Sequence, residues 1–264
     1  MIQNNNNLSV LPFYNSLDEQ NHRRSYAYGA IYPLYTPLYR VPPFQVLLSS
    51  AASPSSITLY KADGTSVGSV SMSVTVKSFT GYAVMLWDGT GAVSAVSAEG
   101  QYYLAMSVGG SMIYSDIFTV VGNISPYTKV EWYDLEDLVM EGCRIVYDLG
   151  NSQYFKNFVY LNTELGKPEY EFEEEGETRD GLFFPEKMIS EKTYKMTFLA
   201  SEYMCDVMRF VRMSDKVKVT DKYGRNYQCD TFLITPKWET QGDLASVEVE
   251  FQTNVVAKRI GRAF

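Results

Sequence analysis

The sequence has 264 residues, of which 45% are hydrophobic and 14% aromatic, a length that predicts more than one module with cores of ordinary size. Its 31 acidic and 23 basic residues give a net charge of −8, without the lysine- and arginine-rich footprint that nucleic-acid binding needs. No apolar run is long enough to span a membrane, and no apolar segment of a signal peptide follows the polar residues 1–7. We therefore expect a protein made in a cytoplasm, without specific nucleic-acid binding and without a membrane partner.

Residues 1–43 combine tyrosine and proline. The tyrosines are Tyr26, Tyr28, Tyr32, Tyr35 and Tyr39, interleaved with Pro33, Pro37, Pro42 and Pro43. Proline disfavours regular strand pairing and favours an extended conformation. Because free disordered segments are usually poor in aromatic residues, we expect an extended N-terminal arm whose tyrosines, together with Phe44, contact a neighbouring subunit. A disordered leader is the alternative.

Residues 44–122 show the pattern of a compact all-β module. The expected strands are Ile57–Tyr60, Val70–Val76, Ala83–Trp87, Tyr102–Val108 and Ile113–Val121, separated by turns at Asp63-Gly64, Asp88-Gly89 and Gly109-Gly110. Their size and spacing predict an immunoglobulin-like β-sandwich, without an inter-sheet disulfide because this stretch contains no cysteine. The closing segment GQYYLAMSVGGSMIYSDIFTVV resembles the last strands of immunoglobulin-like modules in bacterial surface and phage proteins.

Residues 123–264 predict a β-rich domain with one short packed helix. In chain order we expect a strand at Tyr154–Leu161, an acidic run at Glu169–Glu177, a strand at Lys192–Leu199, a helix at Ser201–Met213, a hairpin at Val217–Ile234 and a strand at Ala245–Thr253. Ser201 is placed to cap the helix, and Asp221-Lys222-Tyr223-Gly224 supplies the hairpin turn. A sheet that carries one helix is a common plan for proteins that pair edge to edge into rings.

The residues that usually carry catalysis or bind metals are sparse. The only histidine is His22, and no nucleophile-elbow, phosphate-loop or dinucleotide motif occurs. The cysteines Cys143, Cys205 and Cys229 form no metal-binding pattern, so we expect reduced structural thiols. The acidic segment Glu131–Glu141 lacks the ligand spacing of a calcium loop. The sequence therefore predicts no enzyme, no cofactor and no metal site.

The charges suggest an interface between subunits. The acidic residues Glu171, Glu173, Glu174 and Glu175 lie far along the chain from the basic residues Lys258 and Arg259. In a head-to-tail ring each subunit presents different surfaces to its two neighbours, so an acidic and a basic patch on opposite flanks are complementary. The alternative is a solvated acidic loop without a partner.

Several segments of the C-terminal half resemble one family. They are YFKNFVYLNTELGKPEYEFEEEGETRDGLFFPEKMISEKTYKMTF, FLITPKW and GDLASVEVEFQTN, spread over about Val130 to Gly261. They resemble the neck and tail structural proteins of crAss-like Bacteroides phages. The resemblance implies a role in virion assembly and carries over no catalytic residues.

Together these features predict a virion protein, a subunit of a neck or tail ring around the DNA channel that joins portal and tail. Its expected partners are further copies of itself in a homo-oligomeric ring and the portal or adjacent ring proteins. DNA would pass through the ring without specific binding. The alternative is a glycan- or receptor-binding sandwich on the virion surface that uses loops around Tyr82, Trp87 and Tyr103.

Overall fold

The computed structural model describes residues 9–24, 34–49, 51–140, 143–180, 182–238, 244–253 and 257–260. Within them the protein is mainly β, as predicted, with the helices α1 (Leu17–Arg24) and α2 (Glu202–Met208). The strands of the N-terminal half are β1 (Phe13–Tyr14), β2 (Tyr35–Pro37), β3 (Phe44–Leu48), β4 (Pro54–Lys61), β5 (Ser66–Ser69), β6 (Thr75–Phe79), β7 (Tyr82–Trp87), β8 (Gly100–Val108), β9 (Ser111–Ser115) and β10 (Phe118–Val121). Those of the C-terminal half are β11 (Thr128–Tyr133), β12 (Leu138–Met140), β13 (Cys143–Ile145), β14 (Asp148–Gly150), β15 (Gln153–Tyr154), β16 (Asn157–Leu161), β17 (Glu169–Arg179), β18 (Leu182–Ser201), β19 (Lys216–Thr220), β20 (Asn226–Trp238), β21 (Leu244–Thr253) and β22 (Ala257–Ile260).

The N-terminal half forms a β-sandwich of two packed sheets. One sheet has the strand order β3-β7-β6, and the other is built around β8, which pairs with β4, β9 and β10. Alternate side chains point between the sheets, where Val46, Leu59, Met85 and Leu104 have no exposed surface. The predicted β-sandwich is confirmed, although residues 70–74 precede β6 and belong to no strand.

The described part of residues 1–43 packs into this sandwich. Val10 and Leu11 have no exposed surface, and the centroids of the Phe13 and Phe44 rings are 4.9 Å apart. β1 pairs with β9, and β2 runs parallel to β10. The expectation of an extended arm is therefore wrong for the described part of this segment, because its apolar side chains complete the core of the sandwich.

Helix α1 was not expected from the sequence. The backbone amide of Glu19 donates to the Ser16 hydroxyl at 3.1 Å, and the Glu19 carboxylate accepts from the backbone amide of Asn15 at 3.2 Å. This arrangement satisfies free amides at the start of the helix and follows the Ser-x-x-Glu signal of a capping box. The buried Gln20 side chain donates to the backbone carbonyl of Ser115, which ties the helix to β9.

The C-terminal half continues the sheet that contains β8, because β2 pairs with both β10 and β16, and adds antiparallel strands in the order β16-β11-β19-β20-β21-β18-β17 to give one large sheet. Every second side chain of β21 is buried, as expected for a strand with one face on a core. Helix α2 begins as predicted, because the Ser201 hydroxyl accepts from the backbone amide of Met204 at 3.3 Å. It ends at Met208 instead of Met213, since the following residues form tighter turns with i→i+3 hydrogen bonds.

The predicted turn between β19 and β20 is confirmed. Gly224 has a φ of 75°, a left-handed conformation that glycine adopts without steric cost. The Asp221 carboxylate accepts from the backbone amides of Tyr223 and Arg225, each at 2.9 Å, and from the Arg225 side chain at 2.7 Å. Burial alone raises the pKa of Asp221, but these hydrogen bonds outweigh it and hold the pKa below its ordinary value.

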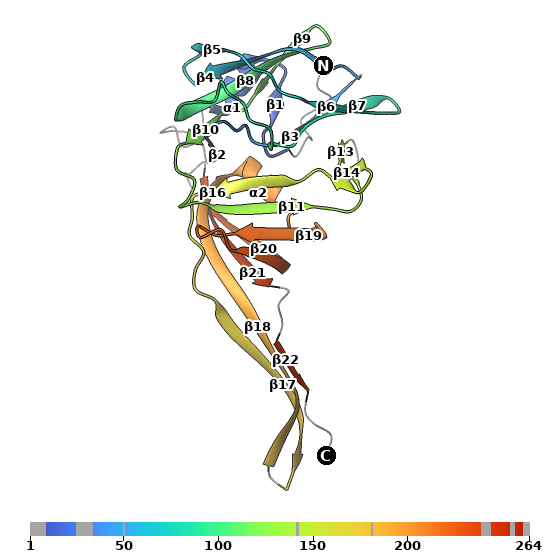
Figure 1. Ribbon diagram of the computed structural model, residues 1–264, viewed down its shortest axis with the longest axis vertical. Helices are drawn as coiled ribbons and strands as arrows, with labels where there is room; N and C mark the ends of the chain where they lie inside the picture. Colours follow the sequence, from blue (N-terminus) through green and yellow to red (C-terminus); the bar gives the residue numbers. More distant parts are fainter. Residues whose placement is uncertain are drawn as a thin grey trace.

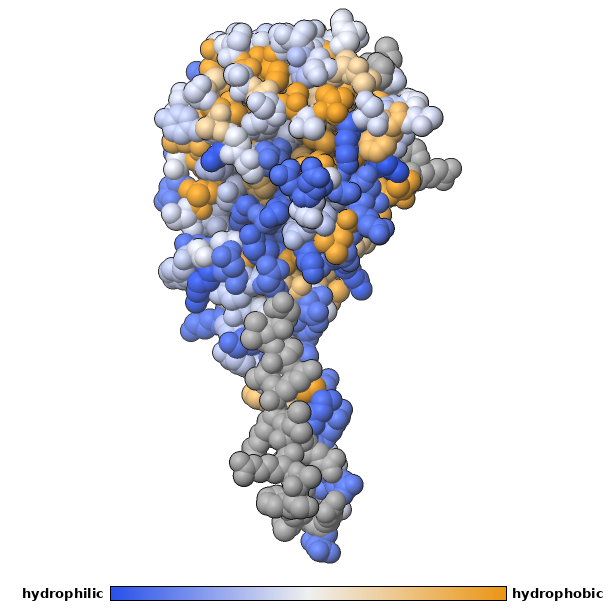
Figure 2. Space-filling view, turned by 45° about the vertical axis from the view of Figure 1, so that its right-hand side comes forward, coloured by the Kyte–Doolittle hydropathy of each residue, from blue (hydrophilic) through white to orange (hydrophobic). Residues whose placement is uncertain are grey.

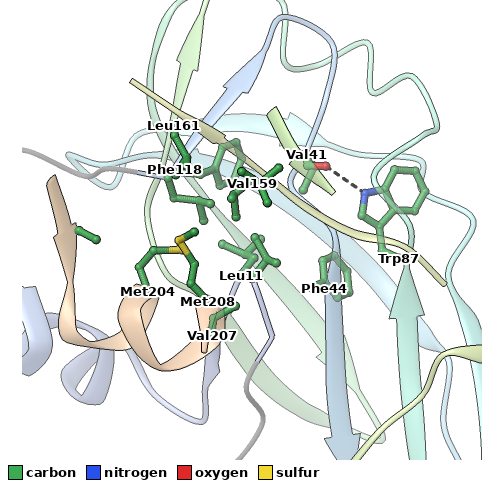
Figure 3. Close-up of a cluster of buried hydrophobic side chains, with 14 of the residues drawn as sticks. Leu11, Val41, Phe44, Trp87, Phe118, Val159, Leu161, Met204, Val207 and Met208 are labelled. Atoms are coloured by element: carbon green, nitrogen blue, oxygen red, sulfur yellow. Dashed lines mark hydrogen bonds between the residues drawn. The ribbon is translucent and has the colours of Figure 1, made fainter. Parts of the chain in front are cut away.

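A single hydrophobic core spans both halves of the chain. Figure 3 shows Met204 and Met208 of α2 together with Leu11, Phe118 and Val159, which come from the N-terminal segment, β10 and β16. All five side chains are at most 4% exposed. The domain boundary expected at residue 122 therefore does not separate two cores.

A second link between the halves is a buried amide. The Gln45 side chain in β3 donates to the Val146 carbonyl at 2.8 Å and accepts from the Val146 amide, also at 2.8 Å. Val146 and Phe155 also pack with Leu47 and Val84 on the outer face of the three-stranded sheet. Residues from the C-terminal half thus cover this sheet, which leaves it little exposed apolar surface.

The long strands β17 and β18 leave the body as a narrow projection (Figure 1). β22 lies beside β18 along this projection and pairs with it antiparallel. At about 3.3 Å per residue, the 11 residues of β17 reach roughly 35 Å. We call this unit of β17, β22 and the β18 segment that pairs with them the projection.

The part of the large sheet that lies outside the projection contains a buried acidic residue, Glu131 in β11. Glu131 in β11 is 8% exposed, and its carboxylate forms ion pairs with Lys129 at 2.8 Å and with Lys218 at 3.0 Å. Burial raises the pKa of Glu131, but the two lysines outweigh it, so the net pKa lies below the ordinary value.

Leu11→Ala should lower the free energy of unfolding by about 2–5 kcal/mol, because it removes a fully buried side chain from the shared core. Leu17→Ala is the matched control: this side chain is 37% exposed, so the change should stay within about 0.5 kcal/mol. Urea denaturation of both variants measures the difference. Equal effects would show that the N-terminal segment is not part of the core.

Glu131→Gln should destabilise the protein at pH 7 by about 1–3 kcal/mol, because the charge that pairs with two lysines is lost. The folded pKa of Glu131 lies below its unfolded value near 4.5, so its stabilisation is present above that pH and is lost as the pH falls further. Urea denaturation of both proteins between pH 7 and pH 3 should show the difference shrinking with acidification. A difference that is independent of pH would contradict this assignment.

Candidate protein-protein interface

The hairpin of the projection has eleven cross-strand pairs, from Glu169 opposite Thr193 to Arg179 opposite Leu182, with a register shift between Glu175 and Gly176. Asp180 follows β17 with a φ of 52°, a left-handed conformation that aspartate tolerates well, and a glycine follows it in the sequence. An Asp-Gly pair is a strong signal for a tight two-residue hairpin connection. The solvated loop considered for the acidic run is therefore wrong, since the run is strand β17.

One face of the projection exposes aromatic side chains. Tyr170 is 55% and Phe172 65% exposed, and they lie opposite Lys192 and Ser190 of β18. Tyr194, two residues beyond Lys192 along β18, shares this face but is buried in the body. The core face of the sheet thus continues past the end of the body, where the Lys192 ammonium lies over the Tyr170 ring, 5.6 Å from its centroid, and both aromatic side chains stay more than half exposed.

Figure 2 shows hydrophilic residues gathered over the middle of the molecule, and small apolar areas at the upper end of the narrow part below. Large exposed aromatic side chains on an otherwise charged surface mark sites of protein-protein contact more often than chance exposure does.

The opposite face of the projection carries charges. Glu169 pairs with Lys195 at 2.8 Å and Glu175 with Lys187 at 3.2 Å, but these groups are exposed and stabilise the hairpin little. Glu171 lies directly opposite Glu191, a pairing of like charges that disfavours the hairpin in isolation.

Of the predicted contact residues, Glu171, Glu173, Glu174 and Glu175 are all exposed in β17. Lys258 and Arg259 belong to β22, so the structure brings the acidic and basic groups onto one projection as its two outer strands. The sequence pattern Glu-Tyr-Glu-Phe-Glu, with its period of two, was the signal from which β17 could have been predicted.

The predicted contact residues of the N-terminal segment are distributed differently. Tyr26, Tyr28 and Tyr32 lie outside the described residues. Tyr39 is 49% exposed and is fixed by backbone hydrogen bonds to the loop before β8, while Tyr35 is partly buried and packs on the Tyr127 ring. Phe44 is fully buried in the core, so its assignment to an accessible contact surface is wrong.

The aromatic residues of the alternative glycan site are not available as a group. Trp87 and Tyr103 are each 5% exposed, and the Trp87 indole donates to the Val41 carbonyl at 3.3 Å. Tyr82 stacks on Phe79, with ring centroids 5.1 Å apart. Stacking on a sugar requires an exposed ring face. Trp87 lacks one because it packs in the core, and Tyr103 lacks one because it is buried and stacked on the Tyr60 ring.

The titratable side chains of the described residues show no constellation for chemistry. Cys205 and Cys229 are free thiols, and burial raises the pKa of Cys205 to about 11 and that of Cys229 to about 12. Thiols with such pKa values are protonated and unreactive near neutral pH. Among the described residues, no group of three or more His, Cys, Asp or Glu is placed to hold a metal ion. No helix in that part of the chain is long and apolar enough to cross a membrane.

Comparison with known proteins adds little. No family model matches the sequence, and no curated protein matches it. Among solved structures, the chain is similar to the crystal structure of Dpr2 Ig1-Ig2 in complex with DIP-Theta Ig1-Ig3, with a TM-score of 0.17 and 7% sequence identity over 88% of this chain and 95% of that chain. A similarity at this level carries no argument about function.

The double variant Tyr170→Ser/Phe172→Ser should keep the free energy of unfolding within about 0.5 kcal/mol of wild type, because both side chains are mostly exposed. Phe198→Ser is the comparison, since Phe198 lies on the same face of the sheet at 5% exposure and should cost at least about 3 kcal/mol. Thermal and urea denaturation report both. A large loss in the double variant would show that the aromatic side chains support the fold instead of remaining free for a partner.

Proposed function

We propose that this protein is a non-enzymatic structural subunit of a phage virion, built into a neck or tail ring around the DNA channel between portal and tail. The projection is the part through which it contacts adjacent subunits or ring proteins. The single observation that carries the proposal is the exposed, two-sided projection, which has no core of its own.

The physical argument concerns the stability of the projection. Beyond the β18 residues that pair with β21 and β22, the projection is a two-stranded hairpin. Such hairpins are marginal in water, because ordering each residue costs about 1–2 kcal/mol and little apolar surface is buried in return. From Glu171 to Thr178 every described side chain is exposed, and the ion pairs along the hairpin are exposed as well. An ordered strand pair of this kind gains most of its stabilisation when a partner covers it.

A sequence resemblance supports the proposal that the assembly is the neck or tail of a phage. The segments that resemble neck and tail proteins of crAss-like phages include the whole of β17 and much of β18. The residues of the resemblance thus include the hairpin of the projection together with β16, part of β20 and β21 of the body. A net charge of −8 is compatible with a channel through which DNA slides without sticking.

The experiment is to locate the protein in purified particles of the phage that encodes it. Immunogold labelling and negative-stain microscopy should place it at the neck or tail, and mass spectrometry should find it in several copies per particle. Its absence from purified particles, or a monomer that binds glycans, would overturn the proposal.

A shortened projection tests the role of this element. Residues 173–189 can be replaced by Asn-Gly, because Phe172 and Ser190 lie opposite each other and a two-residue turn can join them. The variant should fold with a similar melting temperature but be missing from particles. Normal incorporation of the shortened protein would show that the projection is dispensable for assembly.

A further inference from the structure

The projection has two open strand edges. β17 is the last strand of the large sheet and pairs only with β18, and within the described residues β22 also pairs only with β18. Unpaired edges expose backbone donors and acceptors that can pair with another strand. Since β17 carries six glutamates and β22 carries Lys258 and Arg259, one edge is acidic and the other is basic.

The register places the opposite charges at the same level. Glu173 and Lys258 both lie opposite Ile189 of β18, one on each side. Glu174 and Arg259 flank Met188 in the same way. Within one chain these partners are two strands apart, or about 10 Å between backbones, whereas adjacent strands are about 4.8 Å apart.

The strand directions determine how two copies can meet. β17 and β22 each run antiparallel to β18, so they run parallel to each other. When copies are related by rotation about an axis along the projection, β17 of one copy meets β22 of the next in a parallel pair. Without an axial shift, Glu173 then lies beside the neighbouring copy's Lys258, and Glu174 beside the neighbouring copy's Arg259.

The charges also disfavour the competing arrangement. In a two-fold symmetric dimer the same edge meets itself, which would put β17 against β17 and set glutamates beside glutamates. Like charges on facing strand edges are destabilising, and such edges are a known means to prevent wrong pairing. The acidic edge therefore disfavours a two-fold contact and favours a head-to-tail one.

We infer that the occupant of the open β17 edge is β22 of a second copy of this chain, in a parallel edge-to-edge contact held by the pairs Glu173–Lys258 and Glu174–Arg259. Repetition of this heterologous contact closes a ring in which the projections form a continuous sheet. This inference rests on the proposed function, because it specifies how the ring subunits meet.

Two charge-reversed variants test the contact. Glu173→Lys/Glu174→Lys makes both edges basic, and Lys258→Glu/Arg259→Glu makes both edges acidic. Sedimentation velocity and native mass spectrometry should find wild type assembled at low salt, and each variant alone should associate at least about tenfold more weakly. An equimolar mixture of the two should assemble again, because every β17–β22 contact between unlike variants is complementary.

A matched control separates this contact from a general charge effect. Glu171→Lys/Glu191→Lys gives the same change in net charge on the same hairpin but lies outside the β22 register, so it should assemble like wild type. Circular dichroism establishes that all variants are folded. A wild-type protein that stays monomeric, variants that assemble like wild type, or a mixture that fails to assemble would each overturn the inference. If a ring persists in the variants, or particles contain the protein despite these results, the proposed function stands and only this contact fails.

Discussion

The continuity of β18 is the constraint on which the rest of the structure depends. This strand has 20 residues, and its C-terminal part is buried against β21 and α2 while its N-terminal part runs out into the projection. From Lys187 to Ser201 the strand pairs without a register shift, so its buried end and the start of the projection share one direction. The packing of Met196 and Phe198 in the core therefore sets the direction in which the projection leaves the body.

The projection keeps a constant direction only if the body is rigid. The shared core provides this rigidity. Helix α2 follows β18 directly and inserts Met204 and Met208 between the two halves of the chain. Gln45 holds Val146 through two hydrogen bonds, and β2 joins the sheets by pairing with both β10 and β16. Independent movement of the sandwich would have to break these contacts together, so the two halves of the body behave as one unit.

The same alternation of side chains has opposite consequences along one sheet. In the body it directs apolar residues into the core and charges into solvent, as in β21. In the projection no second layer covers the corresponding face, so Tyr170 and Phe172 remain exposed. Exposure of this apolar surface to water is unfavourable in free energy for the isolated subunit. A molecule that covers the surface removes this unfavourable contribution.

By itself, the sequence determined the features that depend on neighbouring residues. The mainly β class, most of the sandwich strands, the turn at Asp221–Gly224 and the cap at Ser201 follow from local periodicity and turn chemistry, and the structure bears them out, whereas the strands expected at Val70–Val76 and Ile113–Val121 are shorter or divided in two. Only the tertiary structure decided that the N-terminal segment completes the sandwich and that one core joins the halves. It also decided that the acidic run is an edge strand whose glutamates share levels with Lys258 and Arg259. These features come from contacts between residues far apart in the chain, and a one-dimensional pattern shows which side chains are apolar or charged but not which of them meet.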